Sequence, residues 1–328
     1  WNITNTCIVS IFSKVFRKRD NTWRCKRIMG LRYSVPKKKK IRLIINTDAK
    51  NEADDQYAIV HALLTPKFDI KHICAAHFGL WRTEESMEES YKEVEKILEL
   101  TGYKNSIELY KGAHQAIKDE NTPEISEGAQ ALIKEALRDD SMPLFAIFLG
   151  PLTDLATAYM LEPKIAEKLT VIWIGGGMWP DGCHEFNLAN DRHAANVVFK
   201  SSIPMWQVPI DVYSKMCVGI AELQYKIYPY GKVGKYLFEQ LVEFNDLLGD
   251  NIGFPSGETW GMGDSAAIGL LLNQQSFEYK KIEAPIVDEN YAYILDKKNR
   301  KIRVYHTIDS RFILEDMFSK MVLNYGRD

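Results

Sequence analysis

The feature that most constrains this chain is an acidic segment directly behind an apolar run. Residues 41–46 read IRLIIN, and four carboxylates follow within eight residues before an apolar pattern resumes at Tyr57; they are Asp48, Glu52, Asp54 and Asp55. This order predicts a strand, an acidic loop and a helix. In open α/β sheets, ligands bind at the carboxyl ends of strands, where this loop would lie.

Two explanations of the acidic loop remain open at this level. Four carboxylates this close repel one another unless a cation lies among them, and a hard divalent cation with oxygen ligands would satisfy them. Alternatively, they form a solvated helix N-terminus, where the helix dipole favours acids. An EF-hand loop fits worse, because Lys50 stands at its third position and Ala53 at its sixth, which requires glycine.

Apolar strand patterns alternate with helical patterns along the chain. This alternation predicts an α/β fold with a Rossmann-like, open, mostly parallel sheet and helices on both faces. We expect residues 41–328 to form a single domain and residues 302–305 to form a late edge strand or hairpin. The predicted strands are 41–46, 70–76, 107–110, 144–149, 171–174 and 205–208, and the predicted helices are 55–64, 86–100, 126–138, 154–161, 191–200 and 219–247.

The composition is that of an ordinary globular chain. Its 328 residues are 46% hydrophobic and 26% charged, and no run approaches the roughly 20 apolar residues of a membrane span. Five scattered cysteines without a CxxC pair favour a reducing compartment over a disulfide scaffold or zinc ribbon. We therefore expect a cytoplasmic protein.

Charge is distributed unevenly. Residues 1–40 hold 12 of the 42 Lys and Arg residues but one of the 44 acids, so this basic leader carries +11 and the remainder −13. An acidic body argues against nucleic acid as a partner.

The leader opens on Trp1, and we expect it to be disordered or non-native, with the native start at Met29. Lysines 37–40 resemble a nuclear-import patch, although a solvated run before the first strand is the simpler explanation.

Polar side chains also follow the later strand patterns. Because the carboxyl ends of parallel strands share one edge, these groups should converge with the acidic loop on a single site. They are His77, Thr153, Asp154, Glu185, Asn187 and Asp264.

Four segments, in the right order, resemble the inosine–uridine-preferring nucleoside hydrolase family. The motifs of that family are D-x-D-P-G-x-D-D-A, then G-P-L-T-N, then G-G…E-F-N…D-P-x-A-A and finally H-D. The counterparts here are NTDAKNEADDQYA at 46–58, GPLTDLATA at 150–158, GGG at 175–177 with EFNLANDRHAA at 185–195, and GDSAA at 263–267. The similarity spans roughly residues 41–270.

This resemblance implies a calcium-dependent N-ribohydrolase. Ca²⁺ would hold the attacking water and the ribose 2′- and 3′-hydroxyls while the sugar develops oxocarbenium character. Asp48 would ligate the metal and take the proton of the water. The other implied ligands are Asp55, the Thr153 carbonyl and Asp264, and the implied ribose-binding residues are Asp54, Glu185 and Asn187.

The resemblance also implies a biological setting. The substrate would be a small-molecule nucleoside or a related N-ribosyl compound, handled in purine or pyrimidine salvage. The assembly would be a homo-oligomer, either a dimer or a tetramer.

Several positions depart from the family pattern. The first Asp of the family is Asn46, its Pro-Gly pair is lost from a loop that is two residues longer, and its asparagine after GPLT is Asp154. The histidine before the last Asp is Gly263. The metal side is therefore kept and the leaving-group side rewritten, so that ribose chemistry is better supported than any base preference.

Gly263 leaves no imidazole to protonate a departing base. His184, beside Glu185, and His77, after the second strand, are the candidate catalytic acids, and each has a structural role as its alternative. Otherwise the leaving group departs without protonation, as a pyridinium would.

Loop tryptophans are candidate substrate contacts. Trp179 and Trp260 are predicted to bind substrate, and at least one of these two and Trp81 should stack on a base or sugar face. Tryptophan is otherwise a core residue, which is the alternative at each position.

Two other functions remain open. Gly263 keeps open a non-catalytic, calcium-dependent ribose- or nucleoside-binding protein, and the same site would also suit a hydrolase of a different glycosyl bond. Retention of Asp48 favours the enzyme, because a binding protein does not need a base.

Overall fold

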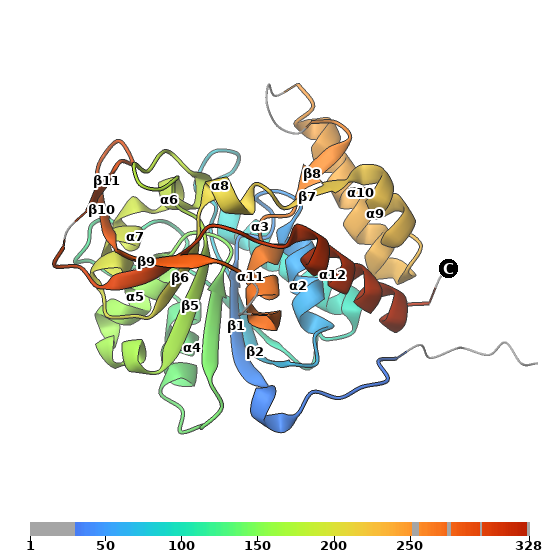
Figure 1. Ribbon diagram of the computed structural model, residues 1–328, viewed down its shortest axis with the longest axis horizontal. Helices are drawn as coiled ribbons and strands as arrows, with labels where there is room; N and C mark the ends of the chain where they lie inside the picture. The colour runs from blue at the N-terminus through green and yellow to red at the C-terminus, as the bar shows by residue number, and fades with distance from the viewer. Residues whose placement is uncertain (1–29, 251–255, 274–276, 296, 327–328) are drawn as a thin grey trace, which may run out of the picture.

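An eight-stranded sheet lies at the centre of the computed structural model, which describes residues 30–250, 256–273, 277–295 and 297–326 (Figure 1). Neighbouring strands are parallel except for β12 and β9. The predicted α/β fold with a mostly parallel sheet is confirmed. In spatial order the strands are β3 (Glu108–Lys111), β2 (Phe68–Ala75), β1 (Ile41–Thr47), β4 (Leu144–Phe148), β5 (Leu169–Ile174), β6 (Met205–Val208), β12 (Lys301–Tyr305) and β9 (Tyr279–Glu283).

Helices cover both faces of this sheet, as Figure 1 shows. The side chains of β1 alternate between the faces, so that Leu43 and Ile45 enter one core and Ile44 enters the other. The first core is closed by α2 (Asp55–Leu63), α3 (Ser86–Thr101), α10 (Gly231–Leu247), α11 (Ser265–Leu272) and α12 (Ser310–Asn324), and the second by α4 (Glu127–Ala136), α5 (Thr153–Leu161) and α7 (Arg192–Lys200).

Short elements complete the described residues, and the sequence patterns did not indicate most of them. The helix predicted at 219–247 is divided into α9 and α10, and residues 302–305 belong to β12, which lies inside the sheet while antiparallel β9 forms its edge. The short elements are η1 (Lys37–Lys39), η2 (Pro163–Glu167), α6 (Phe186–Asn190), α8 (Ile210–Tyr213), α9 (Ile220–Lys226), the pair β7 (Cys217–Gly219) and β8 (Thr259–Gly261), and the pair β10 (Pro285–Val287) and β11 (Tyr293–Leu295).

The predicted basic leader falls largely outside the described residues, which begin at Gly30, and Met29 lies outside them as well. Its lysines 37–39 form the turn η1, directly before β1. Within the described part of the chain, no helix is long and apolar enough to cross a membrane.

The order of the strands reverses beside β1. The chain adds β2 and then β3 on one side of β1, and returns to place β4 on the other side. Such a switch point opens a crevice at the carboxyl ends of the two strands. Asp48 follows β1 here, and a Cβ on Gly150, after β4, would lie 2.8 Å from the Asp48 Cγ. Glycine is therefore needed at 150 for the two loops to approach.

Candidate active site

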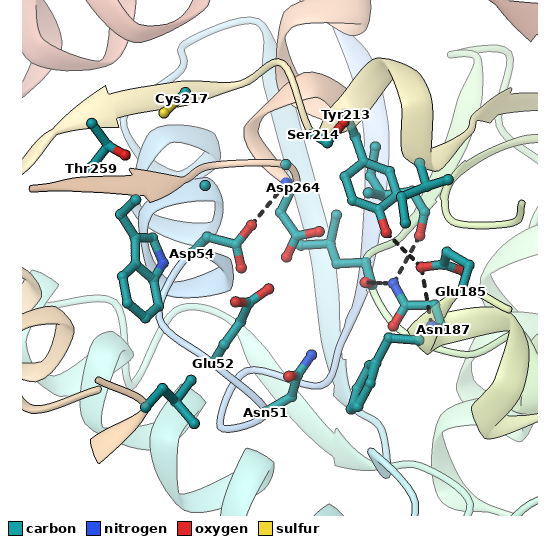
Figure 2. Close-up of a pocket in the computed structure, with 18 of the residues that line it drawn as sticks. Asn51, Glu52, Asp54, Glu185, Asn187, Tyr213, Ser214, Cys217, Thr259 and Asp264 are labelled. Carbon is teal, nitrogen blue, oxygen red and sulfur yellow. Dashed lines mark hydrogen bonds between the residues drawn. The ribbon is translucent and has the colours of Figure 1, made fainter. Parts of the chain in front are cut away.

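A cavity of about 630 Å³ opens at this edge of the sheet, and its lining comes from loops that follow several strands (Figure 2). Among the predicted site residues, it is lined by Asp54, Glu185, Asn187, Trp260 and Asp264. The structure thus brings these five residues to one cavity, whereas Asp48, His77, Thr153 and Asp154 do not line it.

Three buried carboxylates form the acidic centre of the site. One oxygen from each of Asp54, Asp55 and Asp264 lies within 4.8 Å of the others. The Asp264 backbone N–H donates to Asp54 Oδ2 at 3.1 Å, and the Thr47 hydroxyl donates to Asp55 Oδ1. Figure 2 shows Glu52, Asp54 and Asp264 pointing into the same space. Asp55 and Asp264 were predicted as metal ligands, whereas Asp54 was predicted to bind ribose.

Asp48 is fully buried at the end of β1. Its Oδ2 accepts a hydrogen bond from Asn51 Nδ2 at 3.2 Å, and its Oδ1 has no partner among the described residues. Burial, followed by the negative charge of Asp55, raises the pKa of Asp48 well above its usual range. Asp48 is thus a buried carboxylate with one oxygen left to bind a ligand.

The negative charge of the acidic centre is not balanced by a cationic side chain among the described residues that line the cavity. Burial raises the pKa of Asp54 to about 7 and that of Asp55 to about 6. Burial and neighbouring carboxylates raise the pKa of Glu52 and Asp264 as well. No Lys, Arg or His is among the described residues that line the cavity. Oxygen ligands without a cationic side chain suit a hard divalent cation.

The longer first loop is held without the Pro-Gly pair of the family. The Gln56 amide and the Arg82 guanidinium donate to the carbonyl oxygens of Ala49 and Lys50, respectively. The Lys50 ammonium also lies 3.2 Å from a carboxylate oxygen of Glu93. Side chains from two helices and the loop after β2 therefore fix the backbone that carries the carboxylates.

Glu185 is the N-cap of α6 and is held by four donors. Its Oε2 accepts from the backbone N–H groups of Gly176 at 2.7 Å and Leu188 at 2.9 Å. Its Oε1 accepts from the Asn187 N–H at 3.2 Å and from the Tyr213 hydroxyl at 2.8 Å. The carboxylate is therefore rigid at the wall of the cavity.

Asn187 is equally fixed. Its Nδ2 donates to the carbonyl oxygens of Leu149 at 2.7 Å and Ile174 at 2.9 Å, at the ends of β4 and β5. Its Oδ1 is buried and has no partner among the described residues. An oriented acceptor on the cavity wall is what a sugar hydroxyl requires.

Two residues that depart from the family pattern, Asn46 and Asp154, are hydrogen-bonded to each other. The Asn46 Nδ2 donates to Asp154 Oδ2 at 2.8 Å, and Asp154 Oδ1 accepts from Ser126 Oγ at 2.6 Å and the Ala113 N–H at 2.8 Å. Where the family has Asp and then Asn, this chain has Asn and then Asp. The exchange preserves one donor and one acceptor beneath the site.

The structure brings neither predicted catalytic histidine to the cavity. His77 Nδ1 accepts from the Gly79 N–H at 3.2 Å, and its Nε2 donates to the Thr153 hydroxyl at 2.9 Å, which donates to Asp191 at 2.7 Å. Burial lowers the pKa of His77 to about 4, so the ring is neutral. His184 is exposed and packs edge-on against Tyr291, with ring centroids 4.9 Å apart.

The tryptophans divide between the cavity and the core. Trp260 lines the cavity and is fully buried, and Trp81 lines it while 49% exposed, packed edge-to-face on Phe186 at 6.2 Å. Trp179 does not line it; its indole donates to Gln207 Oε1 at 3.0 Å and packs against Tyr293. Tyr213, which sequence patterns did not single out, lines the cavity instead.

Solved structures similar to this one include nucleoside hydrolases. A plant nucleoside hydrolase, PpNRh1, has a TM-score of 0.70 and 18% identity, covering 86% of this chain and 98% of that chain. A purine-preferring ribonucleoside hydrolase from Gardnerella vaginalis has a TM-score of 0.68 and 20% identity, covering 85% and 98%. The fold class is therefore that of the nucleoside hydrolases.

The family follows from the sequence comparison. Residues 43–315 match the inosine-uridine preferring nucleoside hydrolase family, and the chain belongs to it. A curated relative, the pyrimidine-specific ribonucleoside hydrolase RihA of Escherichia coli O139:H28 (strain E24377A / ETEC), is 25% identical over 254 residues, or 68% of this chain and 78% of the relative. The protein is a hydrolase acting on N-glycosyl compounds, from a family whose substrates are small-molecule nucleosides.

Proposed function

We propose that this protein is a calcium-dependent N-ribohydrolase that cleaves the bond between ribose and base in a nucleoside or related N-ribosyl compound. The observation that carries the proposal is the cluster of Asp54, Asp55 and Asp264 within 4.8 Å, with the unsatisfied Asp48 at the end of β1. An oxocarbenium-like sugar is stabilised by negative charge of this kind.

The donor set fits Ca²⁺. Buried carboxylates and an unpartnered carboxylate oxygen supply the hard oxygen ligands that calcium prefers. We assign Asp48, Asp55, Asp264 and the Thr153 carbonyl as ligands. Asp54 lines the cavity whereas Asp55 does not, so we assign Asp54 to a ribose hydroxyl. When bound, Ca²⁺ would polarise the attacking water and orient the sugar.

We assign the remaining steps of the reaction to side chains of the protein. We assign Asp48 to take the proton of the attacking water, and its Oδ1, which has no partner among the described residues, supports this role. Glu185 and the Asn187 Oδ1 orient the ribose from the opposite wall. The electron pair of the C1′–N bond leaves with the base, and ribose and free base are the products.

The setting of the reaction stays a prediction. Free thiols at Cys74, Cys183 and Cys217 support the proposed cytoplasmic location. The homo-oligomer, a dimer or tetramer, rests on the family resemblance alone, as does a role in nucleoside salvage.

The decisive experiment measures ribose release from a panel of purine and pyrimidine nucleosides, because the relatives include both pyrimidine-specific and purine-preferring enzymes. We expect release with millimolar Ca²⁺, its loss in EDTA, and recovery when calcium is restored. Release that EDTA does not affect would refute calcium dependence. Calcium and nucleoside binding without any release would favour the non-catalytic binding protein.

A further inference from the structure

The ring of Tyr213 fills the space above Gly263. A Cβ on Gly263 would lie 2.8 Å from Tyr213 Cδ2 and 3.4 Å from its Cγ, so any side chain at 263 must displace this ring. Gly263 is not among the glycines with positive φ. The lack of room for a side chain, and not the backbone conformation, therefore explains why residue 263 is glycine. Tyr213, at the end of α8, and Gly263, directly before Asp264, are therefore in close contact, and both line the cavity.

The hydroxyl of Tyr213 is held in place within the cavity. It donates to Glu185 Oε1 at 2.8 Å, a contact drawn in Figure 2, and Glu185 is itself fixed by three backbone N–H groups. Burial and the charge of Glu185 raise the pKa of Tyr213 well above its usual range, so the phenol keeps its proton at neutral pH. It is an oriented donor between the proposed ribose-binding wall and the acidic centre.

Tyr213 can be compared with cationic donors and with Cys217 and Thr259. Among the described residues that line the cavity, none is His, Lys or Arg. Cys217 and Thr259 belong to the β7 and β8 pair, which Figure 2 shows on the other side of Asp264 from Glu185. Tyr213 is the lining residue whose hydroxyl is anchored to a proposed ribose-binding residue and whose ring adjoins Gly263.

We propose that Tyr213 occupies the place of the missing imidazole and that its hydroxyl turns its one proton from Glu185 Oε1 to the departing base, to which it donates a hydrogen bond; this inference rests on the proposed function. Glu185 keeps its three backbone N–H donors when the phenol turns away. The C1′–N bond breaks and its electron pair leaves with the base, whose developing charge the phenol stabilises. Water adds to C1′, and the proton that it releases is the one that the free base finally carries. Tyr213 keeps its own proton throughout, so the products are ribose and the neutral base.

The first test compares Tyr213→Phe with wild type on two kinds of leaving group. Inosine and uridine have poor leaving groups, whereas p-nitrophenyl β-D-ribofuranoside has one that departs without assistance. Loss of a hydrogen bond to developing charge should lower kcat on the nucleosides roughly 10- to 100-fold, and on the activated riboside by less than about 3-fold. Tyr228→Phe, outside the cavity, is the matched control and should change neither.

The outcomes separate this inference from the proposed function. Equal losses on both substrates, or no loss on the nucleosides, would refute the role of Tyr213 while leaving the N-ribohydrolase intact. A wild type that cleaves none of the substrates would refute the proposed function and this inference together.

The second test measures the fit between the two residues by thermal stability and then by rescue of activity. Gly263→Ala should lower Tm by roughly 2–8 °C in the wild type, because the ring resists the new methyl group, but should have little effect in a Tyr213→Ala background. The double variant Tyr213→Ala/Gly263→His should cleave inosine faster than Tyr213→Ala alone. Additive Tm changes, together with no such gain, would show that the residues do not share one place.

Discussion

The two halves of the cavity are built on different principles. The acidic half presents Asp54 and Asp264, and one oxygen of Asp55, which does not line the cavity, lies within 4.8 Å of theirs. Asp54 accepts from the Asp264 backbone N–H, and Asp55 accepts from Thr47. The other half, which we propose receives the leaving group and call the leaving-group half, presents Tyr213 and Trp260. The proposed cation would accept few kinds of ligand, which would explain why the acidic half keeps the carboxylates of the family motifs. A departing base needs only a surface and a donor, which different residues can supply.

Three departures from the family pattern each lie against a specific neighbour. Asn46 and Asp154 exchange donor and acceptor across one hydrogen bond of 2.8 Å, and Gly263 makes room for Tyr213. A buried group left without its partner costs free energy, so a change at one position is tolerated when its neighbour changes with it. The difference between the halves is therefore testable by mutation.

The largest effect is expected in the acidic half, at Asp48. Asp48→Asn should lower kcat by roughly two to four orders of magnitude, because the amide cannot take the proton of water. Steady-state release of ribose measures this, with the exposed Asp139→Asn as control. Activity close to wild type would remove Asp48 from its assigned role.

The next effect is on stability, beneath the acidic half. Asn46→Asp places a second buried carboxylate against Asp154 and should destabilise the fold by about 2–4 kcal/mol in urea unfolding. Asn46→Asp/Asp154→Asn restores one donor and one acceptor, and should recover most of that loss. A double variant no more stable than the sum of the single changes would show that the exchange is not compensated.

Calcium should act more strongly as pH rises. In the metal-free protein the pKa values of Asp54, about 7, and Asp55, about 6, lie above those of an unfolded chain. The folded state then binds more protons, and stability present at low pH is lost as pH rises from about 4 through 7. Saturating Ca²⁺ replaces those protons and should raise Tm by several degrees at about pH 8 and by less at about pH 5.5.

This calcium effect can be contradicted directly. Asp264→Asn should shrink the Tm shift at both pH values, because it removes one of the clustered carboxylates. A shift that is larger at acid pH, or unchanged in that variant, would place calcium elsewhere.

The smallest effect is expected at the mouth of the leaving-group half. Trp81 is half-exposed and packs on Phe186, so Trp81→Ala should raise KM for nucleosides a few-fold, with kcat nearly unchanged. Trp81→Phe retains an aromatic face and should restore most of the affinity. A fall in kcat with KM unchanged would contradict a binding role.

Local patterns determined much of the fold. Strand and helix periodicities repeat every few residues, so the sequence alone predicted the parallel sheet, the helices on both faces and the loops that carry Asp48, Glu185 and Asp264. It did not predict α6, α8 or the β7 and β8 pair, which are three to five residues long and lie in the loops after the strands, outside the strand and helix alternation. The position of β12 inside the sheet depends on β9, which has no distinguishing pattern of its own.

The candidate site, like the fold, has features that the sequence predicted and others that depend on the tertiary structure. The sequence by itself determined which residue types reach the edge of the sheet, since the end of each strand is encoded locally. Only the tertiary structure decided that His77 and His184 lie outside the cavity, that Asp154 holds Asn46, and that Tyr213 fills the space above Gly263. These pairings join residues 50 to 108 positions apart along the chain or depend on which way a loop turns. Contacts of that kind arise from the packing of whole elements, and no short stretch of sequence contains them.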